Sequence, residues 1–255
     1  MDRPVHDPSV TVNFEIRLPA SEDSQASYDQ IYSQEGIQQL DSFYLWLLQL
    51  LDPVAGRHLL DIAGGAGALN KFAREYYHVR AVDCDISLNA LRRAATAHPG
   101  FLGSVADGER LPFPTDSFDY VTCIGSLEHF PDMRRGVQEI ARVLKTDGLA
   151  CILVPNTYSL LGNVYSAYKH GASIIDNQPL QRYAARAEWE WLLRGNGLAV
   201  ERTVKYERER PLTLTDVRWY WAHKKALIRL LLSPLVPLNL ASCFVFLCRP
   251  IAPDV

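Results

Sequence analysis

An acid followed at once by a run of small residues is the first pattern in this chain that suggests chemistry. Residues 59–69 read LLDIAGGAGAL, so an apolar run ends at Asp61 and meets Gly64, Gly65 and Gly67. Small residues at the end of a strand let the main chain turn tightly and approach a ligand without clashes from Cβ atoms. A helix that starts after such a turn offers unpaired N–H groups, which suit a carboxylate or a phosphate. The alternative interpretation is a tight turn between a strand and a helix that binds nothing.

The spacing of these glycines departs from the dinucleotide-binding fingerprint. That fingerprint is G-x-G-x-x-G, and after Gly65 and Gly67 its third glycine is replaced by Asn70. The acid four residues before Gly65 is also foreign to it. A nicotinamide-dependent oxidoreductase is therefore the less favoured class of protein.

Two further acids follow the next strand-like run, which reads AVDCDIS and contains Asp83 and Asp85. An acid at the end of the second strand can accept hydrogen bonds from both hydroxyls of a ribose. Asp83 directly follows the apolar run, whereas Asp85 lies closer to the start of the helix that comes next. We therefore predict Asp83 as the ribose acceptor and Asp85 as the second candidate. The alternative is structural, with Asp85 or Ser87 capping the first turn of that helix. After a third short strand, Asp107 can accept a hydrogen bond from an exocyclic amine.

Strand-like and helix-like runs alternate along most of the chain. Such alternation predicts right-handed crossovers and a mostly parallel sheet with helices on both faces, whose ligands bind at the carboxyl ends of the strands. We expect an N-terminal arm (1–26) and one domain (27–255), with a helical cap (27–52) and a helical insertion (about 211–241) between the last two strands. The expected strands are 58–63, 79–85, 101–107, 117–125, 148–156, 198–206 and 241–249, and the main helices between them are 69–77, 87–98, 133–145 and 186–197.

Composition limits the classes of partner. The formal net charge of −3 gives no general attraction to nucleic acid. The five cysteines form no C-x-x-C pair, and no acid or histidine cluster has metal-ligand spacing, so we expect reduced thiols and no metal. The polar N-terminus lacks the pattern of a signal peptide, which favours a cytoplasmic protein. The patterns favour no particular oligomeric state.

The C-terminal third contains one uncharged stretch, residues 230–248, that is long enough to cross a membrane. It contains two prolines and an asparagine, so we predict a buried loop followed by a strand. The aromatic and basic residues of the insertion before it suggest a cover for the sheet edge and a wall of a pocket. A dimer contact and a peripheral contact with a membrane surface are the less favoured alternatives.

Taken together, five motifs in order resemble the class I S-adenosylmethionine-dependent methyltransferases, most closely the branch of ubiquinone and menaquinone biosynthesis. LLDIAGGAG is similar to the first motif of that family, VDCDIS to the acidic motif of the second strand, and ADGERLPFPTDSFD to the adenine-binding stretch. GSLEHFPD resembles the end of the fourth strand, and EIARVLKTDGLACILVPN the helix and fifth strand that follow. The resemblance covers about 55–206 and a strand near 242–249. It implies a Rossmann-like, seven-stranded, mostly parallel sheet with an antiparallel last strand.

The resemblance also implies which residues bind the cofactor, S-adenosyl-L-methionine. The glycine turn would line its methionine part, the acids of the second strand its ribose, and the stretch around residue 107 its adenine. Tyr28 resembles an aromatic residue on an N-terminal helix that closes over the methionine end. The implied cofactor-binding residues are Tyr28, Asp61, Ala63, Gly64, Gly65, Gly67, Asp83, Cys84 beside the adenine, Asp85, Asp107, Gly108, Ile124 and Gly125.

Methyl transfer from a sulfonium needs positioning above all, because the methyl group is already activated. A base helps when the nucleophile is a hydroxyl, and His129 in LEHF is the first candidate, with Glu128 the second. The alternative is that His129 only holds a loop or the cofactor. The acceptor is expected to be a small organic molecule methylated at oxygen, although no residue decides the atom. The alternative function is a methyltransferase-like protein that binds the cofactor without methyl transfer, as a cyclase scaffold or a regulatory partner.

Overall fold

The computed structural model describes residues 14–17, 23–34, 36–37, 39–175 and 178–251. Its strands are β1 (Phe14–Arg17), β2 (His58–Ile62), β3 (Arg80–Asp85), β4 (Gly103–Val105), β5 (Phe118–Ile124), β6 (Leu144–Pro155), β7 (Leu180–Tyr183), β8 (Leu198–Tyr206) and β9 (Cys243–Pro250). Seven of them form one sheet in the order β4-β3-β2-β5-β6-β9-β8, and β1 pairs with β7 in a small antiparallel sheet. β9 runs antiparallel to β6 and β8, and the other neighbours in the large sheet are parallel. The predicted α/β fold is therefore confirmed.

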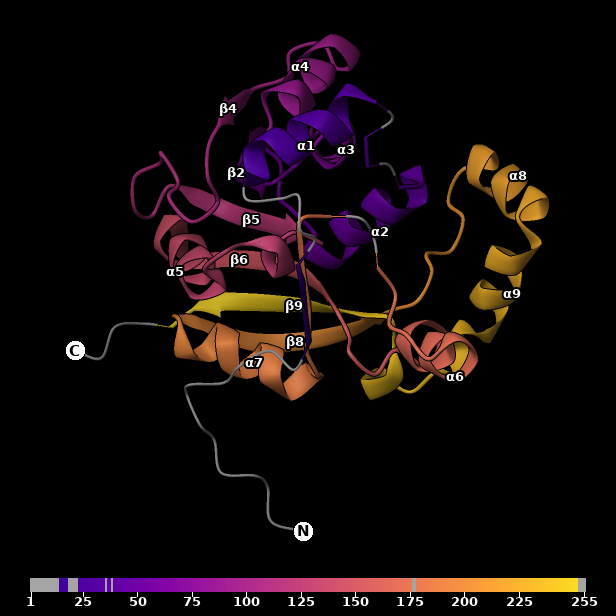
Figure 1. Cartoon of the computed structure of the whole chain (residues 1–255). Helices are drawn as coiled ribbons and strands as arrows, with labels where there is room; N and C mark the ends of the chain where they lie inside the picture. The colour runs from indigo at the N-terminus through magenta and orange to yellow at the C-terminus, as the bar shows by residue number, and fades with distance from the viewer. Residues whose placement is uncertain (1–13, 18–22, 35, 38, 176–177, 252–255) are drawn as a thin grey trace.

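Helices cover both faces of the large sheet (Figure 1). The helices are α1 (Ser24–Ser33), α2 (Asp41–Leu51), α3 (Ala68–Tyr77), α4 (Leu88–Ala97), α5 (Met133–Val143), α6 (Tyr165–His170), α7 (Arg186–Gly195), α8 (Leu214–Ala222) and α9 (Lys224–Leu232), with short turns η1 (Leu127–His129), η2 (Leu160–Val164), η3 (Ser233–Leu235) and η4 (Leu238–Leu240). α5 and α7 pack against one face, and α2 and α3 against the other. α8 and α9 instead stand away from the sheet as a projecting pair (Figure 1).

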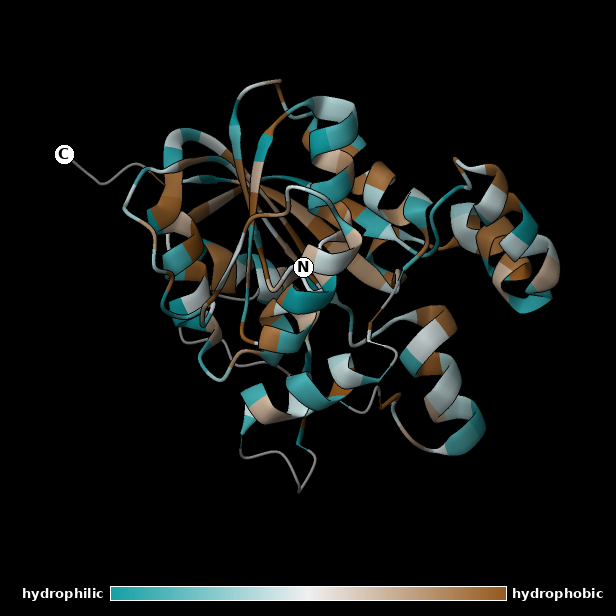
Figure 2. Ribbon diagram, turned by 90° about the horizontal axis from the view of Figure 1, so that it is seen from above, coloured by the Kyte–Doolittle hydropathy of each residue, from teal (hydrophilic) through white to brown (hydrophobic). Residues whose placement is uncertain are grey.

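The alternation of side chains along β2 shows how the core forms on both sides. Leu60 and Ile62 point to the face covered by α5 and α7, whereas Leu59 points to the face covered by α2 and α3. All three are at most 1% exposed. In Figure 2 the central strands are correspondingly hydrophobic, while the covering helices carry hydrophilic turns. The next residue on the Leu59 face is Asp61, so the strand pattern itself places an acid inside the molecule.

The short sheet of β1 and β7 was not among the predicted strands, since each strand has only four residues. β7 nevertheless matters for the site, because it runs beside η1 at the end of β5. Short strands whose partners lie far away in the chain give too little periodicity to be recognised.

The strand that we predicted at the end of the uncharged stretch 230–248 forms as β9, but the residues before it are not a buried loop. The stretch contains the end of α9, the turns η3 and η4, and most of β9. The strand is buried, but Leu231 and Leu235 are 69% and 77% exposed. The prediction is wrong for the loop, whose contact with β8 is polar: the carbonyl of Val236 accepts from Lys205 Nζ at 2.7 Å. Within the described ranges, no helix has the length and apolar character needed to cross a bilayer.

Candidate functional site

The glycine turn joins β2 to α3 with three residues in the left-handed region of backbone conformation. Ala63, Gly65 and Gly67 have φ angles of 55°, 59° and 75°. The N–H groups of Ala63 and Gly64 donate to the carbonyl of Cys84 at 2.7 and 3.3 Å, which ties the turn to the end of β3. A residue with a Cβ atom pays about 1–2 kcal/mol in this region, so Ala63 carries strain of the kind found at binding sites.

Two side chains occupy the space that Cβ atoms on this turn would need. A Cβ at Gly64 would overlap Oδ1 of Asp83, and a Cβ at Gly65 would overlap the hydroxyl of Tyr32. Both positions therefore require glycine for close approach, independently of their φ angles. The turn is enclosed by an acid from β3 on one side and an aromatic residue from α1 on the other.

α1 brings two tyrosines to the site, one helical turn apart. Tyr28, the residue implied by the resemblance, lines a small cavity, and its hydroxyl donates to Oε1 of Gln178 at 3.0 Å. Tyr32, which sequence reasoning missed, lines this cavity and a larger one and lies over Gly65. Burial, and then the charge of Asp85, raise the pKa of Tyr32 above its usual value. The spacing of the two tyrosines in SYDQIY was the available signal, because residues i and i+4 share one face of a helix.

Asp61 and Asp83 lie side by side on the parallel strands β2 and β3, with Thr122 of β5 on the other side of Asp61. Asp61 Oδ1 accepts a hydrogen bond from Thr122 Oγ1 at 2.6 Å, whereas among the described residues neither oxygen of Asp83 has a hydrogen-bond partner. Both acids are buried, at 4% and 0% exposure. Burial raises the pKa of Asp61 to about 7, and burial together with the charge of Asp61 raises the pKa of Asp83 well above its usual range. This pair favours a proton or a cation beside the turn.

Asp85 lies at the tip of β3 and reaches the turn directly. Its Oδ2 accepts from the N–H of Gly65 at 2.9 Å, and its Oδ1 accepts from the N–H of Ser87 at 2.8 Å. Asp85 lines the small cavity, whereas Asp83 lines neither this cavity nor the larger one. Our preference for Asp83 over Asp85 as the ribose acceptor is therefore not supported by the geometry. The capping role falls to Ser87, whose hydroxyl accepts from the N–H of Ala90.

The small cavity, of about 90 Å³, brings together the loops after β3 and β4. Asp107 and Gly108, which the resemblance places beside an adenine, line it. Cys84 does not: its side chain lies in the core on the α5 face, and burial raises the pKa of its thiol. Ile86, two residues later, lines the cavity instead. The acid and the apolar residue of β3 and its following loop that line this cavity are thus Asp85 and Ile86. Each lies two residues after the residue first expected there, Asp83 or Cys84.

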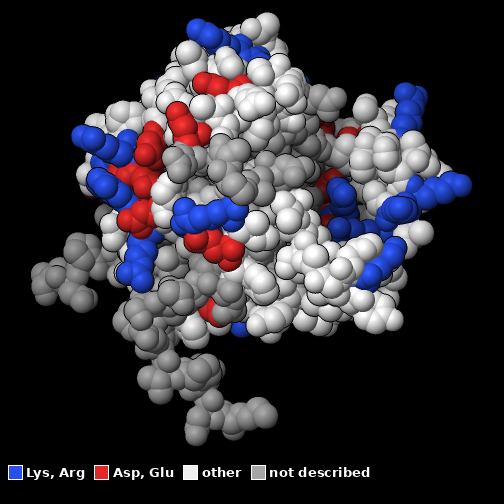
Figure 3. All heavy atoms as spheres, in the orientation of Figure 1, with Lys and Arg blue, Asp and Glu red and all other residues white. Residues whose placement is uncertain are grey.

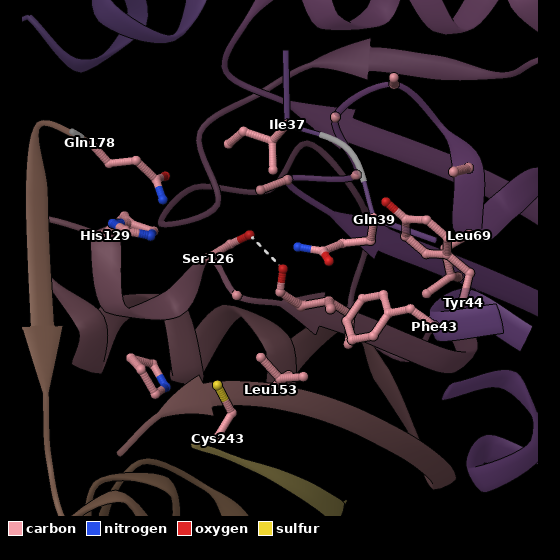
Figure 4. A pocket seen from close by; sticks show the side chains of 18 of the residues that line it. Ile37, Gln39, Phe43, Tyr44, Leu69, Ser126, His129, Leu153, Gln178 and Cys243 are labelled. Carbon is pink, nitrogen blue, oxygen red and sulfur yellow. Dashed lines mark hydrogen bonds between the residues drawn. The ribbon is translucent and has the colours of Figure 1, made fainter. Parts of the chain in front are cut away.

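The larger cavity, of about 920 Å³, extends from the glycine turn past the ends of β5 and β6. Figure 4 shows His129 and Gln178 on one side of it, Phe43 and Tyr44 from α2 on the other, and Cys243 at its base. Burial, and then Asp61, raise the pKa of Tyr44 to about 12. Among the sequence-predicted residues, those that line this cavity are Asp61, Ala63, Gly64, Gly65, Ile124, Gly125, Glu128 and His129, while Gly67 lines neither cavity.

His129 is held by the strand that sequence analysis missed. Its Nδ1 forms a hydrogen bond with the carbonyl oxygen of Leu180 at the start of β7. A carbonyl only accepts, so Nδ1 carries the hydrogen in the neutral ring and Nε2 is the basic nitrogen. Oε1 of Glu128 lies 3.8 Å from Nε2, and both side chains are almost fully buried. The arrangement can take up a proton at Nε2 and stabilise the resulting charge.

A metal centre finds no support in the described part of the chain, where no three His, Cys, Asp or Glu side chains are arranged to hold an ion. The five cysteines are unpaired, and four of them are buried.

Comparison with known proteins relates this architecture to a family. Residues 60–152 match the family Methyltransf_11, described as a methyltransferase domain. The chain is 30% identical over 158 residues to the uncharacterized methyltransferase YcgJ of Bacillus subtilis, covering 60% of this chain and 61% of that protein. It is 32% identical over 148 residues to the ubiquinone/menaquinone biosynthesis C-methyltransferase UbiE of Vibrio vulnificus, covering 52% of this chain and 57% of that protein. The chain thus spans about three fifths of the length of these curated relatives.

Solved structures show the same fold. The S-adenosylmethionine-dependent methyltransferase from Mesorhizobium loti superposes with a TM-score of 0.59 over 82% of this chain and 97% of that chain. The two sequences are 17% identical, so this likeness concerns the fold alone.

Proposed function

We propose that this chain is a class I S-adenosylmethionine-dependent methyltransferase, which its matches to a methyltransferase domain and to two methyltransferases support, and that it transfers a methyl group from that cofactor to a small, largely apolar organic acceptor. The observation that carries this proposal is the meeting of two cavities at the glycine turn. The small one is lined by Asp85 and Asp107, and the large one contains a buried base, His129. The small cavity would thus hold part of the carrier of an activated methyl group, and the adjoining large cavity would hold the acceptor.

The residues around the turn fit the cofactor chemically. It carries a sulfonium and an ammonium. Two buried, repelling acids, Asp61 and Asp83, lie beneath the turn, and no residue in the described part of the chain donates a hydrogen bond to either oxygen of Asp83. Positive charge near them would relieve that repulsion. We assign Asp85 to the ribose hydroxyls, Asp107 with Gly108 to the adenine, and the main chain of the turn to the methionine part. When bound, the cofactor supplies a methyl group that needs no further activation.

The chain itself contributes a base. Nε2 of His129 takes the proton of an acceptor hydroxyl, and the hydrogen bond from Nδ1 to Leu180 keeps the ring in the tautomer this requires. Glu128, 3.8 Å from Nε2, stabilises the imidazolium that forms. Buried surroundings strengthen this interaction, because the effective dielectric constant is low there.

We propose carbon, beside an ionisable hydroxyl, as the methylated atom rather than the oxygen expected from the sequence. The name of the Vibrio vulnificus relative specifies a C-methyltransferase, which supports this choice. Loss of the hydroxyl proton to His129 raises the electron density at the neighbouring carbon of an aromatic ring as well as at oxygen. When that carbon takes the methyl group, it loses its own proton to solvent and the oxygen regains one from His129, which restores the aromatic phenol. The aromatic and aliphatic lining of the large cavity, with Phe43, Leu153 and Tyr206, suits such a ring.

The proposal is tested with methyl-labelled cofactor and a panel of phenols and hydroquinones, with products identified by mass spectrometry and NMR. We expect S-adenosylhomocysteine and a methylated ring. His129→Asn retains a donor toward Leu180 but lacks a basic nitrogen, so kcat should fall about 10²- to 10⁴-fold while cofactor affinity is unchanged. A cofactor-bound protein that releases no S-adenosylhomocysteine with any of these acceptors would favour the alternative, a scaffold or regulatory partner without methyl transfer.

A further inference from the structure

We propose that the projecting helices α8 and α9 dock this protein onto the surface of an anionic lipid bilayer. The inference does not rest on methyl transfer, because it concerns a surface away from the glycine turn. From the sequence alone, peripheral membrane contact is the less favoured alternative for this segment, whereas the structure favours it. The reason is that residues expected to be a buried loop are exposed.

The side of the pair that faces the body is held by polar contacts. Asp216 accepts from the N–H of Ser42 at 2.8 Å, and the hydroxyl of Tyr220 donates to the carbonyl of Glu209 at 2.8 Å. Both Asp216 and Tyr220 are 2% exposed. The helices are therefore anchored through their polar groups, which leaves other side chains to face solvent.

The outward side of the pair exposes large apolar side chains among its basic ones, unlike an ordinary surface helix, whose exposed face is polar. On α8 the exposed row contains Leu214 and Trp221, seven residues apart, at 78% and 73% exposure. On α9 and η3 it continues with Ile228, Leu231 and Leu235, of which Ile228 is 56% exposed. In Figure 2 these helices carry hydrophobic turns although they project from the body. Apolar patches of this kind on a single chain mark an interaction surface.

The charge of the same segment specifies its partner. Residues 211–235 contain four Lys and Arg side chains and one acid, Asp216, which is buried against Ser42, whereas the whole chain has a net charge of −3. Arg218, Lys224 and Lys225 are exposed. Figure 3 shows Lys and Arg gathered over this projection. A chain with an overall negative charge can approach an anionic surface closely only through such a face, so the orientation is defined as well as the attraction.

A second group of exposed aromatic and aliphatic side chains lies on η2 and α6, which stand at the same end of the molecule as α9 (Figure 1). It includes Tyr168, which is 90% exposed, and Tyr165, with Lys169 beside them. The large cavity lies between these two segments, since Asn163 of η2 and Arg229 of α9 both line it. Two separate patches that combine Trp and Tyr with Leu and Lys, around one cavity, fit a lipid surface, where such side chains lie at the headgroup level.

Co-sedimentation of the full chain with vesicles tests this proposal. We expect binding to vesicles of equal phosphatidylcholine and phosphatidylglycerol, at least tenfold stronger than to phosphatidylcholine alone, and weaker at 0.5 M than at 0.1 M salt. Lys224→Glu/Lys225→Glu should reduce binding at least tenfold. Acids in the first turn of a helix favour its dipole, so α9 should remain folded. The matched control is Arg134→Glu/Arg135→Glu, an exposed pair on α5, which should bind within twofold of the original chain.

A second variant examines the apolar side. Trp221→Ser/Leu231→Ser should abolish binding, and Tyr76→Ser, a similarly exposed residue on α3, should not. Absence of vesicle binding by the unchanged chain would overturn the proposal, as would equal losses in the α9 and α5 charge variants. A dimer in light scattering that Trp221→Ser/Leu231→Ser dissociates, with no vesicle binding, would identify the face as a contact between two copies instead.

Discussion

Replacing Asp61 by Asn should make the unliganded protein more stable at high pH. An unfolded aspartate has a pKa near 3.8, and burial raises that of Asp61 to about 7 in the folded protein. Between these values the folded state binds more protons than the unfolded state, so stability falls as pH rises from about 4 to 7. The difference between the folded and unfolded pKa of Asp61 corresponds to at most about 4 kcal/mol at pH 8.

Asn at position 61 retains an acceptor for Thr122 Oγ1 and adds a donor beside Asp83, whose oxygens accept no hydrogen bond from any residue that the structure describes. We therefore expect a gain of about 2–4 kcal/mol in the free energy of unfolding at pH 8, and a gain near zero at pH 4. In a protein of this size such a gain raises Tm by about 4–16 °C. The same substitution should weaken cofactor binding, since it removes a charge that favours the cationic methionine part.

Urea denaturation followed by circular dichroism at pH 4 to 8.5 measures this effect without cofactor. Asp147→Asn is the control, because it removes one acid from an exposed position. If the stability curves of the original chain and of Asp61→Asn run parallel across this range, the reasoning on the buried pair is refuted.

Two further predictions concern the turn and the base of the sheet. Gly65→Ala places a Cβ against the hydroxyl of Tyr32 at a φ of 59°, so it should cost about 1–3 kcal/mol in urea denaturation, part of which Tyr32→Phe should restore; full stability of Gly65→Ala alone would contradict this. Burial alone would raise the pKa of Asp119, but hydrogen bonds from a main-chain N–H, Lys145 and Arg57 lower it to about 2. The contribution of Asp119 to the stability of the folded protein is therefore complete above about pH 4 and is lost as pH falls toward 2. Asp119→Asn should lower the free energy of unfolding at pH 7 by about 1–2 kcal/mol, after allowance for its exposed partners. It should also reduce the loss of stability between about pH 4 and pH 2, and an unchanged loss there would contradict the role given to Asp119.

The fold could be predicted from the sequence because its elements are long and periodic. The run at 133–145, for example, has Val137, Ile140 and Leu144 at helical spacing, and α5 forms there with Val137 and Ile140 fully buried. β7 has four residues and its partner β1 lies more than 160 residues away, so no local pattern indicates it. The position of His129 depends on this strand, which is why its tautomer could not be derived from the sequence.

The acids of β3 show a different limit. Asp83 and Asp85 point to the same face, two residues apart, and sequence alone does not say where the neighbouring strand ends. β2 ends opposite Cys84, so Asp83 remains between strands beside Asp61, and Asp85 extends beyond them to the level of the turn. Register between strands, which depends on packing across the whole sheet, therefore decided which acid reaches the cavity.

Calorimetric titration with S-adenosylhomocysteine, comparing Asp85→Ala with Asp83→Asn, tests the central assignment most directly. We predict one saturable site per chain, an affinity at least tenfold weaker in Asp85→Ala, which is about 1.4 kcal/mol or more, and a smaller loss in Asp83→Asn, which removes only a charge below the turn. No saturable binding by the original chain, or the same affinity in Asp85→Ala, would contradict the account.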